Sequence, residues 1–389
     1  MIEAIFYNYM REMLRQTPME FHRYLYDEIN WDNRLIGILG PRGVGKSTLI
    51  LQHIKALDAP RTHIFITAES LWFSEHTLLE FADSFSAMGG EYLYIDEIHK
   101  YKGWSRELKL IYDMHPALHV VFTGSSILDI KKGESDLSRR VLLYKLEGMS
   151  FREYLMMKEH ISLPAFTLKQ IVNNEVDIPE IALPAFHEYL QRGYYPFFTQ
   201  DGYSVRLTQI VSQTIEVDIP IFANMQVSTT RKLRQLLAVI AKTAPVKPNM
   251  SNLSQEFGIS KNTIPDYFTY LETAGMIGML RDDTSGLRVL GKLEKVYLDN
   301  TNLMYALTGD DTNIGNARKT FFYNQTRVRN QVTASRVSDF TIDGMTFEVG
   351  GKNKGKKQIS EVKQGYVVKD DIVYGYGNVI PLWHFGMNY

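Results

Sequence analysis

Short apolar runs alternate with amphipathic segments along the first part of the chain. Leu35 to Leu39, Thr62 to Thr67 and Glu91 to Ile95 have the length and β-branched or aromatic content of buried strands. Helix-like segments follow the first two, so the order from Leu35 is β-α-β-α-β. His119 to Phe122 and Val141 to Leu146 have the pattern of further strands. This alternation predicts a mostly parallel sheet with crossover helices.

Two helices are expected ahead of this sheet. Ile2 to Leu14 carries apolar residues at helical spacing, which gives one apolar face. Thr17-Pro18-Met19-Glu20 has the pattern of a capped helix start, with Thr17 as N-cap, and predicts a second helix to about Ile29.

The second half of the chain changes character twice. Residues 151–224 are mostly helical in pattern. Helical segments from 231 to 274, interrupted by a turn with Gly258, then precede two strand-like runs, Met276 to Leu280 and Leu287 to Tyr297. Two helices joined by such a turn and followed by two strands predict a winged helix. After the polar loop Thr308 to Asp311, a helix and alternating strands predict a small α/β domain.

Composition narrows the classes of function. With 389 residues the chain is long enough for two or three domains, at roughly 150 residues each. A net charge of −1 excludes a uniformly basic nucleic-acid binder, and the lack of Cys excludes disulfides and thiol catalysis. The N-terminus lacks an export signal, and there is no apolar run of about 18 residues. We therefore expect a cytoplasmic protein without a membrane segment.

A phosphate-binding loop of the form G-x-x-x-x-G-K-[ST] joins the first strand to its helix. Gly43 and Gly45 let successive backbone N–H groups point at a phosphate, and the helix offers its N-terminus. Lys46 is expected to reach the β- and γ-phosphates of ATP, and Ser47 to ligate Mg²⁺. The nucleotide-binding segment comprises Gly40, Pro41, Arg42, Gly43, Val44, Gly45, Lys46, Ser47 and Thr48.

Two adjacent carboxylates follow the third strand, at the edge where such sheets bind nucleotides. We expect Asp96 to hold Mg²⁺ and Glu97 to polarise the attacking water. Ser125, after the fourth strand, either orients that water or only caps a helix. Arg139 and Arg140 either complete a neighbouring subunit's site or form surface salt bridges.

The motifs GPRGVGKST, LYIDEIHK, TGSS and SRRVLLYKLEGMSFREYL together resemble a family of bacterial and archaeal AAA-type ATPases. The resemblance implies ATP binding and hydrolysis, with Lys46, Ser47, Asp96 and Glu97 at the family's functional positions. It also implies an AAA core, a helical segment, a winged helix and a domain similar to the restriction-endonuclease fold. A homo-oligomer is compatible with this resemblance.

Nucleic-acid contact is a separate hypothesis. The second helix of the helix-turn-helix is expected to expose Lys261, Asn262, Thr263, Asp266 and Tyr267, although the alternative is a protein-docking winged helix. The Gly-rich loop with Lys352, Lys354, Lys356 and Lys357 either binds phosphates or blunts a sheet edge.

Asp339 and Glu348 resemble the metal-binding pair of a PD-(D/E)xK nuclease, in which two carboxylates hold Mg²⁺ and a Lys two residues after the Glu assists water. The chain departs from this pattern, because Gly350 occupies the lysine position and Lys319 stands where the helix often carries an acid. Glu361-Val362-Lys363 supplies another E-x-K, whose pairing the sequence does not fix. A degenerate nuclease-like domain is therefore expected.

The predicted domains are residues 1–150 (ATPase), 151–224 (helical segment), 225–307 (winged helix) and 308–389 (nuclease-like). The predicted function is Mg²⁺-dependent ATP hydrolysis coupled to a conformational change in the C-terminal half. The alternatives are a nucleotide-gated regulator that binds duplex DNA and hydrolyses ATP slowly, an ATPase acting on a protein partner, and an ATP-dependent nuclease.

Overall fold

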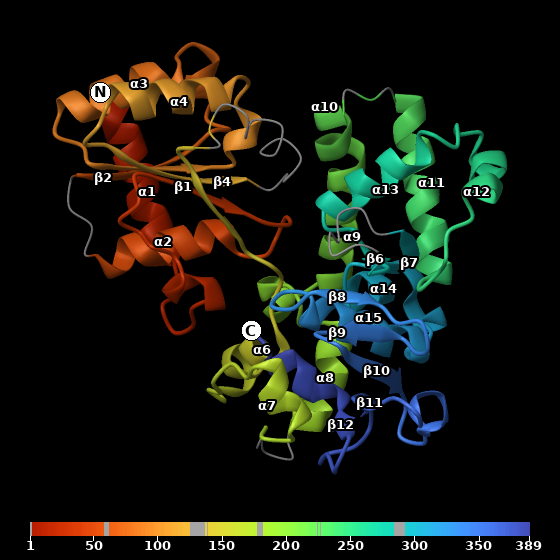
Figure 1. Ribbon diagram of the computed structural model, residues 1–389. Coiled ribbons are helices and arrows are strands. Elements are labelled where there is room, and N and C mark those ends of the chain that lie inside the picture. Colours follow the sequence, from red (N-terminus) through yellow and green to blue (C-terminus); the bar gives the residue numbers. More distant parts are fainter. Residues whose placement is uncertain are drawn as a thin grey trace. The chain divides into compact units, whose positions relative to one another are not determined.

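A parallel five-stranded sheet forms the centre of the first part of the protein (Figure 1), in the order β2-β3-β4-β1-β5. The computed structural model describes residues 2–57, 62–124, 137, 139–176, 182–223, 225, 227–283 and 292–389. The strands are β1 (Leu35–Leu39), β2 (His63–Thr67), β3 (Tyr92–Asp96), β4 (His119–Gly124) and β5 (Leu142–Lys145).

Helices cover both faces of this sheet. Helices α3 and α4 lie over one face and α2 over the other, while α1 packs along the edge strand β2 (Figure 1). The central strands have the continuous apolar pattern of strands buried on both sides, as their sequence predicts. The helices are α1 (Ile2–Gln16), α2 (Lys46–Ala56), α3 (Leu78–Ala87) and α4 (Trp104–Met114), with short 3-10 turns η1 (Tyr24–Asp27), η2 (Leu71–Ser74) and η3 (Ile98–Lys100).

One element predicted for this region is wrong. The segment from Thr17 to Ile29 is not a helix and contains only the short turn η1. The Thr17 hydroxyl donates to the carbonyl of Met13 at 2.8 Å, so it bonds back to the last turn of α1 instead of capping a new helix. A Thr-Pro pair fits the exit of one helix as well as the start of another, because Pro cannot continue a helix.

The chain forms two compact units, Met1–Glu147 and Gly148–Tyr389. The second unit begins with α6 (Phe151–Glu159), α7 (Leu168–Val172), α8 (Ala182–Gln191), η4 (Pro196–Thr199) and α9 (Tyr203–Gln213). The π-helical turn η5 (Thr214–Asp218) and α10 (Ile219–Ala223) follow, and α11 (Val227–Thr243), α12 (Met250–Phe257) and α13 (Ile264–Thr273) precede the antiparallel pair β6 (Ile277–Arg281) and β7 (Leu293–Leu298).

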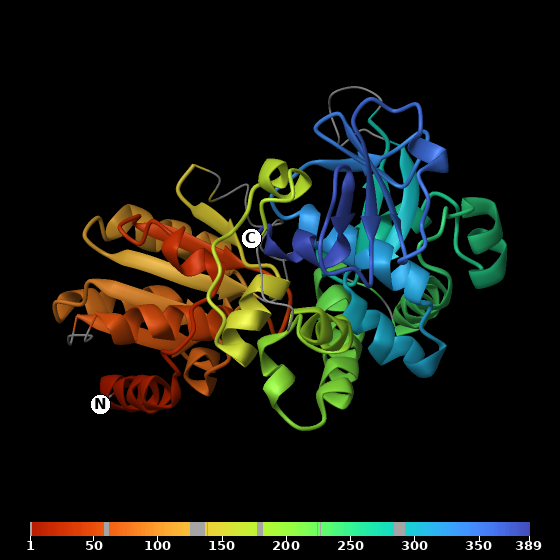
Figure 2. The same cartoon turned by 90° about the horizontal axis from the view of Figure 1, so that it is seen from below.

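A second five-stranded sheet, in the order β12-β11-β10-β9-β8, completes the second unit (Figure 2). The helix α15 packs on β10, and its Phe322 contacts the rings of Phe340, Phe347 and Phe385. The elements are α14 (Thr301–Thr308), η7 (Gly309–Asp311), α15 (Ile314–Thr326), β8 (Val332–Ala334), β9 (Phe340–Ile342), β10 (Met345–Gly350), η8 (Lys357–Ile359), β11 (Gly365–Lys369), β12 (Val379–Pro381) and η9 (Leu382–Met387).

The segments predicted as winged helix and nuclease-like domain share a core. Tyr297 of β7 packs against Tyr323 and Phe340, and the Tyr323 hydroxyl donates to the carbonyl of Met279 at 3.0 Å. Arg327 also forms an ion pair with the buried Asp299. Residues 148–389 therefore fold as one unit, within which the predicted finer boundaries stay predictions.

Candidate nucleotide site

The loop between β1 and α2 turns at two glycines. Gly43 and Gly45 have φ of 84° and 97°, in the left-handed region where a side chain is disfavoured. Gly45 is also the N-cap of α2, so the helix begins at Lys46. The glycine spacing of the sequence thus produces a sharp strand-loop-helix turn of the kind that offers backbone N–H groups to an anion.

The start of the loop lies against the end of the first unit. A Cβ on Gly40 would come within 2.2 Å of the carbonyl oxygen of Leu146, so only glycine fits there. The backbone N–H of Leu146 in turn donates to the carbonyl of Leu39 at 2.7 Å. The start of the loop is therefore in direct contact with the last residues of this unit.

Lys46 is buried, and its ammonium donates to the carbonyls of Gly40 and Pro41, each at 2.9 Å. The charged group therefore lies folded over its own loop. An ammonium has three donors, so it can exchange such carbonyl partners for phosphate oxygens without leaving the loop.

Asp96 at the end of β3 receives two hydroxyl groups from other elements. Ser47 of α2 donates to Asp96 Oδ1 at 2.9 Å, and Thr123 of β4 donates to the same oxygen at 2.5 Å. The strand order explains this meeting, because β4 lies between β1 and β3 and all three end at the same edge. Ser47 and Asp96, which the sequence assigned to one metal ion, are thus in direct contact.

Burial is the main cause that raises the pKa of the Asp96 carboxyl above its usual range, and the charge of Glu97 adds to it. Hydrogen bonds from Thr123 and Ser47 and the charge of Lys46 act in the opposite direction. A carboxylate in this position would be stabilised by a cation. The donor set of one hydroxyl and one carboxylate has the oxygen chemistry that Mg²⁺ prefers, together with phosphate and water.

Glu97 directly follows β3 and has a backbone conformation unlike that of a strand residue. Its φ of 53° is left-handed, a conformation that costs on the order of 1 kcal/mol for a residue other than glycine. Its backbone N–H donates to Thr123 Oγ1 at 3.0 Å, and its Oε2 lies 3.4 Å from Nε2 of His99. Thr123 Oγ1 thus contacts both the Asp96 carboxylate and the backbone of Glu97.

Three residues of this region were not predicted from the sequence. Thr123 bridges Asp96 and the Glu97 backbone, whereas the sequence pattern predicted a polar role at this strand end for Ser125. The sequence signal for Thr123 was a hydroxyl residue near the end of β4, the strand that lies between β1 and β3. His99 lies beside Glu97, and its place two residues later gave no signal.

The third is Arg23, which is buried and donates to two carbonyls. Its guanidinium contacts the carbonyl of Val44 in the phosphate loop, and Nη2 donates to the carbonyl of Glu147 at 2.7 Å. It therefore ties the loop to the residue that ends the first unit. The sequence gave no signal for it, since it lay in a segment predicted as a helix.

The remaining predicted residues of the first unit lie apart from these contacts or are not described. Arg140 forms a two-pronged pair with Asp113, with Nε–Oδ1 at 2.9 Å and Nη2–Oδ2 at 3.0 Å. Arg139 is exposed next to it. Ser125 lies outside the described residues, so its role stays a prediction.

The residues predicted to contact DNA are in the second unit. Lys261 and Asn262 are exposed and Thr263 is half-buried, but they form the turn before α13 and are not on the helix itself. Tyr267, expected on the solvent face, is buried because it lies on the inward side of α13. Lys352 is exposed, whereas Lys354 contacts the carboxylate of Glu348.

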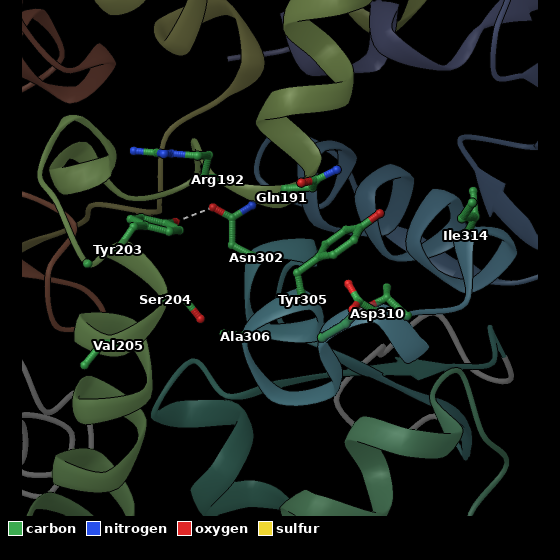
Figure 3. Close-up of a pocket in the computed structure, with 13 residues that line it drawn as sticks. Gln191, Arg192, Tyr203, Ser204, Val205, Asn302, Tyr305, Ala306, Asp310 and Ile314 are labelled. Atoms are coloured by element: carbon green, nitrogen blue, oxygen red, sulfur yellow. Dashed lines mark hydrogen bonds between the residues drawn. The ribbon is translucent and has the colours of Figure 1, made fainter.

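Among the described residues, His187, Asp370 and Asp371 offer a group of metal-ligand atoms within 4.8 Å of one another. Arg318 already compensates their charge, with Nε 2.6 Å from Asp370 and Nη2 3.4 Å from Asp371. A pocket of about 660 Å³ elsewhere in this unit lies between α8, α9 and α14 (Figure 3) and is lined by Arg192, Tyr203, Asn302 and Tyr305, among others. None of the predicted site residues lines it.

Comparison with known proteins supports the class of fold. Residues 32–155 match a family model described as an AAA domain, and residues 183–314 match one described as a domain of unknown function. The first unit is a P-loop α/β domain of the AAA type, as predicted, and helical and α/β segments follow it.

One relative is an uncharacterised protein of Methanocaldococcus jannaschii, 24% identical over 309 residues. The match covers 69% of this chain and 65% of the relative, which is less than two thirds of its length.

Two solved structures were also found to be similar. The Walker-type ATPase of Pyrococcus abyssi has a TM-score of 0.43 and 14% identity over 72% of this chain and 93% of its own. The DnaA protein of Aquifex aeolicus, solved with AMPPCP bound, has a TM-score of 0.32 and 13% identity over 67% of this chain and 86% of its own. Among the residues that the structure describes, no helix has the length and apolar content to cross a membrane.

Proposed function

We propose that this protein binds ATP together with Mg²⁺ and hydrolyses it at the edge of the first sheet. The observation that carries the proposal is the contact of Ser47 and Thr123 with Asp96 beside the Gly43–Gly45 turn. A hydroxyl and a lysine at the start of α2 thus lie close to a carboxylate at the end of β3. The match of residues 32–155 to an AAA domain supports the same function.

Each residue has a separate task in the proposed reaction. The loop N–H groups and Lys46 bind the phosphates. Ser47 and Asp96 would hold Mg²⁺, which would supply charge neutralisation at the phosphate oxygens. Glu97 accepts a proton from the water that attacks the γ-phosphorus, while the bond to the β–γ bridging oxygen breaks and ADP leaves. Thr123 keeps Asp96 and the Glu97 backbone in register.

Hydrolysis is proposed to act on the C-terminal half through the end of the first unit. Arg23 holds the loop carbonyl of Val44 and the carbonyl of Glu147, and Gly40 touches the Leu146 carbonyl. The chain continues from Glu147 directly into Gly148, where the second unit begins. A change of loop shape when phosphate leaves would therefore move the entry to that unit.

The first test is phosphate release from the purified protein with ATP and Mg²⁺. Lys46→Ala should abolish nucleotide binding and release, measured with a fluorescent ATP analogue and a coupled phosphate assay. A wild type that binds no nucleotide, or a Lys46→Ala variant that hydrolyses at the wild-type rate, would contradict the proposal.

An arginine acting across a subunit interface is a second element of the proposal. Arg139 is exposed, whereas Arg140 already pairs with Asp113. Arg139→Ala should therefore lower ATP hydrolysis more than Arg140→Ala, and only at protein concentrations at which the protein self-associates in sedimentation runs. Concentration-independent activity in both variants would exclude a trans arginine.

A further inference from the structure

Two buried carboxylates come together in the second unit, away from the nucleotide site. Asp339 precedes β9 and is 5% exposed, and Glu348 lies in the adjacent strand β10 and is 2% exposed. The N–H of Val349 donates to Asp339 Oδ2 at 3.0 Å, and the Ser338 hydroxyl contacts Glu348 Oε2. The hairpin therefore fixes both side chains in one place, as the nuclease-like pattern of the sequence requires.

Each carboxylate is paired with an ammonium group from a different element. Lys319 of α15 lies 2.5 Å from Asp339 Oδ1, and Lys354 contacts Glu348 Oε1. Lys295 of β7 is a third cation, 3.9 Å from Asp339 Oδ1. We call these five residues the lysine-carboxylate cluster.

Lys354 occupies the space of the lysine that the sequence pattern lacks. A Cβ on Gly350, two residues after Glu348, would lie 2.7 Å from both Cγ and Cδ of Lys354. The Lys354 side chain thus occupies the space that the Cβ of a larger residue at position 350 would need. The absence of a lysine at position 350 is therefore compensated in space by a residue four positions later.

The charges of the cluster disfavour a divalent cation. A cation bound to both carboxylates would have to displace Lys319 and Lys354, whose two charges already balance the two acids. Lys295 then leaves the five residues with one net positive charge. The side chains of Asp339 and Glu348 are 6% and 3% exposed, whereas those of Lys295, Lys319 and Lys354 are 34%, 28% and 32% exposed, so the lysines are more accessible to a ligand than the acids.

Half-buried ammonium groups held in place by buried acids are suited to bind an anion. Each ammonium has three donors. Lys319 uses one on Asp339, and Lys354 uses one on Glu348 and one on Gln358 Oε1 at 3.5 Å, so each keeps a donor for a further acceptor. The loop that follows β10 in the sequence also contains Lys354 and adds the exposed cations Lys352, Lys356 and Lys357. A single small anion needs fewer cations than this, whereas a polyanionic backbone with regularly spaced phosphates engages several.

We propose that Lys319 and Lys354 take the place of a divalent cation in the lysine-carboxylate cluster, and that the cluster binds a backbone phosphate of nucleic acid without metal and without cleaving it. This inference goes beyond ATP hydrolysis and does not depend on it. The partner is recognised by charge and not by sequence, because the donors are ammonium groups.

The test uses the full-length protein and a short fluorescent DNA duplex, with binding followed by anisotropy in EDTA over a series of KCl concentrations. Two charge-neutral double variants remove one ion pair each, Lys319→Met with Asp339→Asn and Lys354→Met with Glu348→Gln. Their net charge equals that of the wild type, so the long-range field of the protein is preserved. The matched control is Lys158→Met with Glu188→Gln, which removes another lysine-carboxylate pair of the same unit.

We expect the wild type and the control to bind the duplex equally in EDTA and in Mg²⁺, and the duplex to stay intact in Mg²⁺ or Mn²⁺. Each cluster variant should bind more weakly, with a salt slope lower by about one, the loss of one phosphate contact. Lys319→Arg, which keeps the charge at this position, should retain binding.

Three results would overturn the inference. They are binding that requires a divalent cation, cleavage that Glu348→Gln abolishes, and cluster variants whose affinity and salt slope equal those of the control. Repeating the measurement in the Lys46→Ala background separates this inference from the proposed ATPase. Duplex binding in EDTA should persist there even if the nucleotide site is lost.

Discussion

Two pairs of carboxylates, one in each unit, show how the partners of an acid decide what it can bind. Asp96 is held by the hydroxyls of Ser47 and Thr123, which carry no charge, and we propose that Mg²⁺ adds to the charge of Lys46 in balancing it. Asp339 and Glu348 are held by the ammonium groups of Lys319 and Lys354, so their charge is already balanced. We therefore propose a cation site at the first pair, whereas at the second pair the lysines already cover the acids.

The largest expected effect tests the first pair. Glu97→Gln should still bind ATP but slow hydrolysis by about 10²- to 10⁴-fold, because the amide cannot accept the proton of the attacking water. Nucleotide affinity and single-turnover phosphate release measure the two effects separately. Hydrolysis at the wild-type rate would show that Glu97 is not the base.

Next in size is the loss of one ammonium from the second pair. Lys319→Met leaves the buried Asp339 without its 2.5 Å partner and should lower the free energy of unfolding by about 3 kcal/mol. The double variant with Asp339→Asn should recover most of this loss, because no buried charge is then left uncompensated. Urea unfolding of both variants measures the difference. Equal stability of the single and double variants would mean that water or Lys295 compensates Asp339.

The phosphate loop and the strand that carries Asp96 could be predicted from the sequence, because glycine spacing and apolar runs encode local backbone structure. The sequence was not sufficient for the contacts of Thr123 and Arg23, which arise from the strand order and from a carbonyl at the other end of the unit. Those contacts join residues far apart along the chain, and no local pattern encodes them.

For the second carboxylate pair too, the local pattern could be predicted but the contacts formed by folding could not. The hairpin of Asp339 and Glu348 could be predicted from alternation, and the missing lysine at position 350 could be noted. That Lys354 fills this space depends on how the loop after β10 folds back, which spacing alone does not determine. The failed helix after Thr17 has a related cause, since Thr-Pro fits either end of a helix.

Removal of the Thr123 hydroxyl tests how much its two hydrogen bonds contribute to hydrolysis at the first site. Thr123→Val deletes a donor to Asp96 and an acceptor for the Glu97 N–H, so hydrolysis should slow by about 2 kcal/mol in activation free energy. Thr123→Ser keeps both bonds and is the matched control. Steady-state hydrolysis with saturating Mg²⁺ and ATP measures it, and equal rates in the two variants would remove Thr123 from the site.

The stability of the second unit should depend on pH because His384 is buried in its core. Burial lowers the pKa of His384 to about 3, so the unfolded chain takes up a proton from pH 6.5 downward while the folded chain does not. Stability is therefore complete above pH 6.5 and declines below it, by about 2 kcal/mol at pH 5. His384→Phe should reduce the loss between pH 7 and pH 5 in urea unfolding. His160→Asn, at an exposed position, should not, and an unchanged loss in His384→Phe would assign the acid sensitivity to other groups.

The smallest effect is expected for an ion pair at the surface of the first unit. Arg140 and Asp113 are bonded at 2.9 Å and 3.0 Å, but their side chains are 29% and 43% exposed, so water screens the pair. Arg140→Ala should therefore change the free energy of unfolding by less than about 1 kcal/mol, in contrast to the loss of Lys319 from a buried acid. Urea unfolding beside Lys319→Met gives the comparison directly. If Arg140→Ala lowered the free energy of unfolding as much as Lys319→Met, burial of the acid would not explain the difference between the two pairs. Charge compensation by Lys319 would then not account for the stability of Asp339 in the second unit.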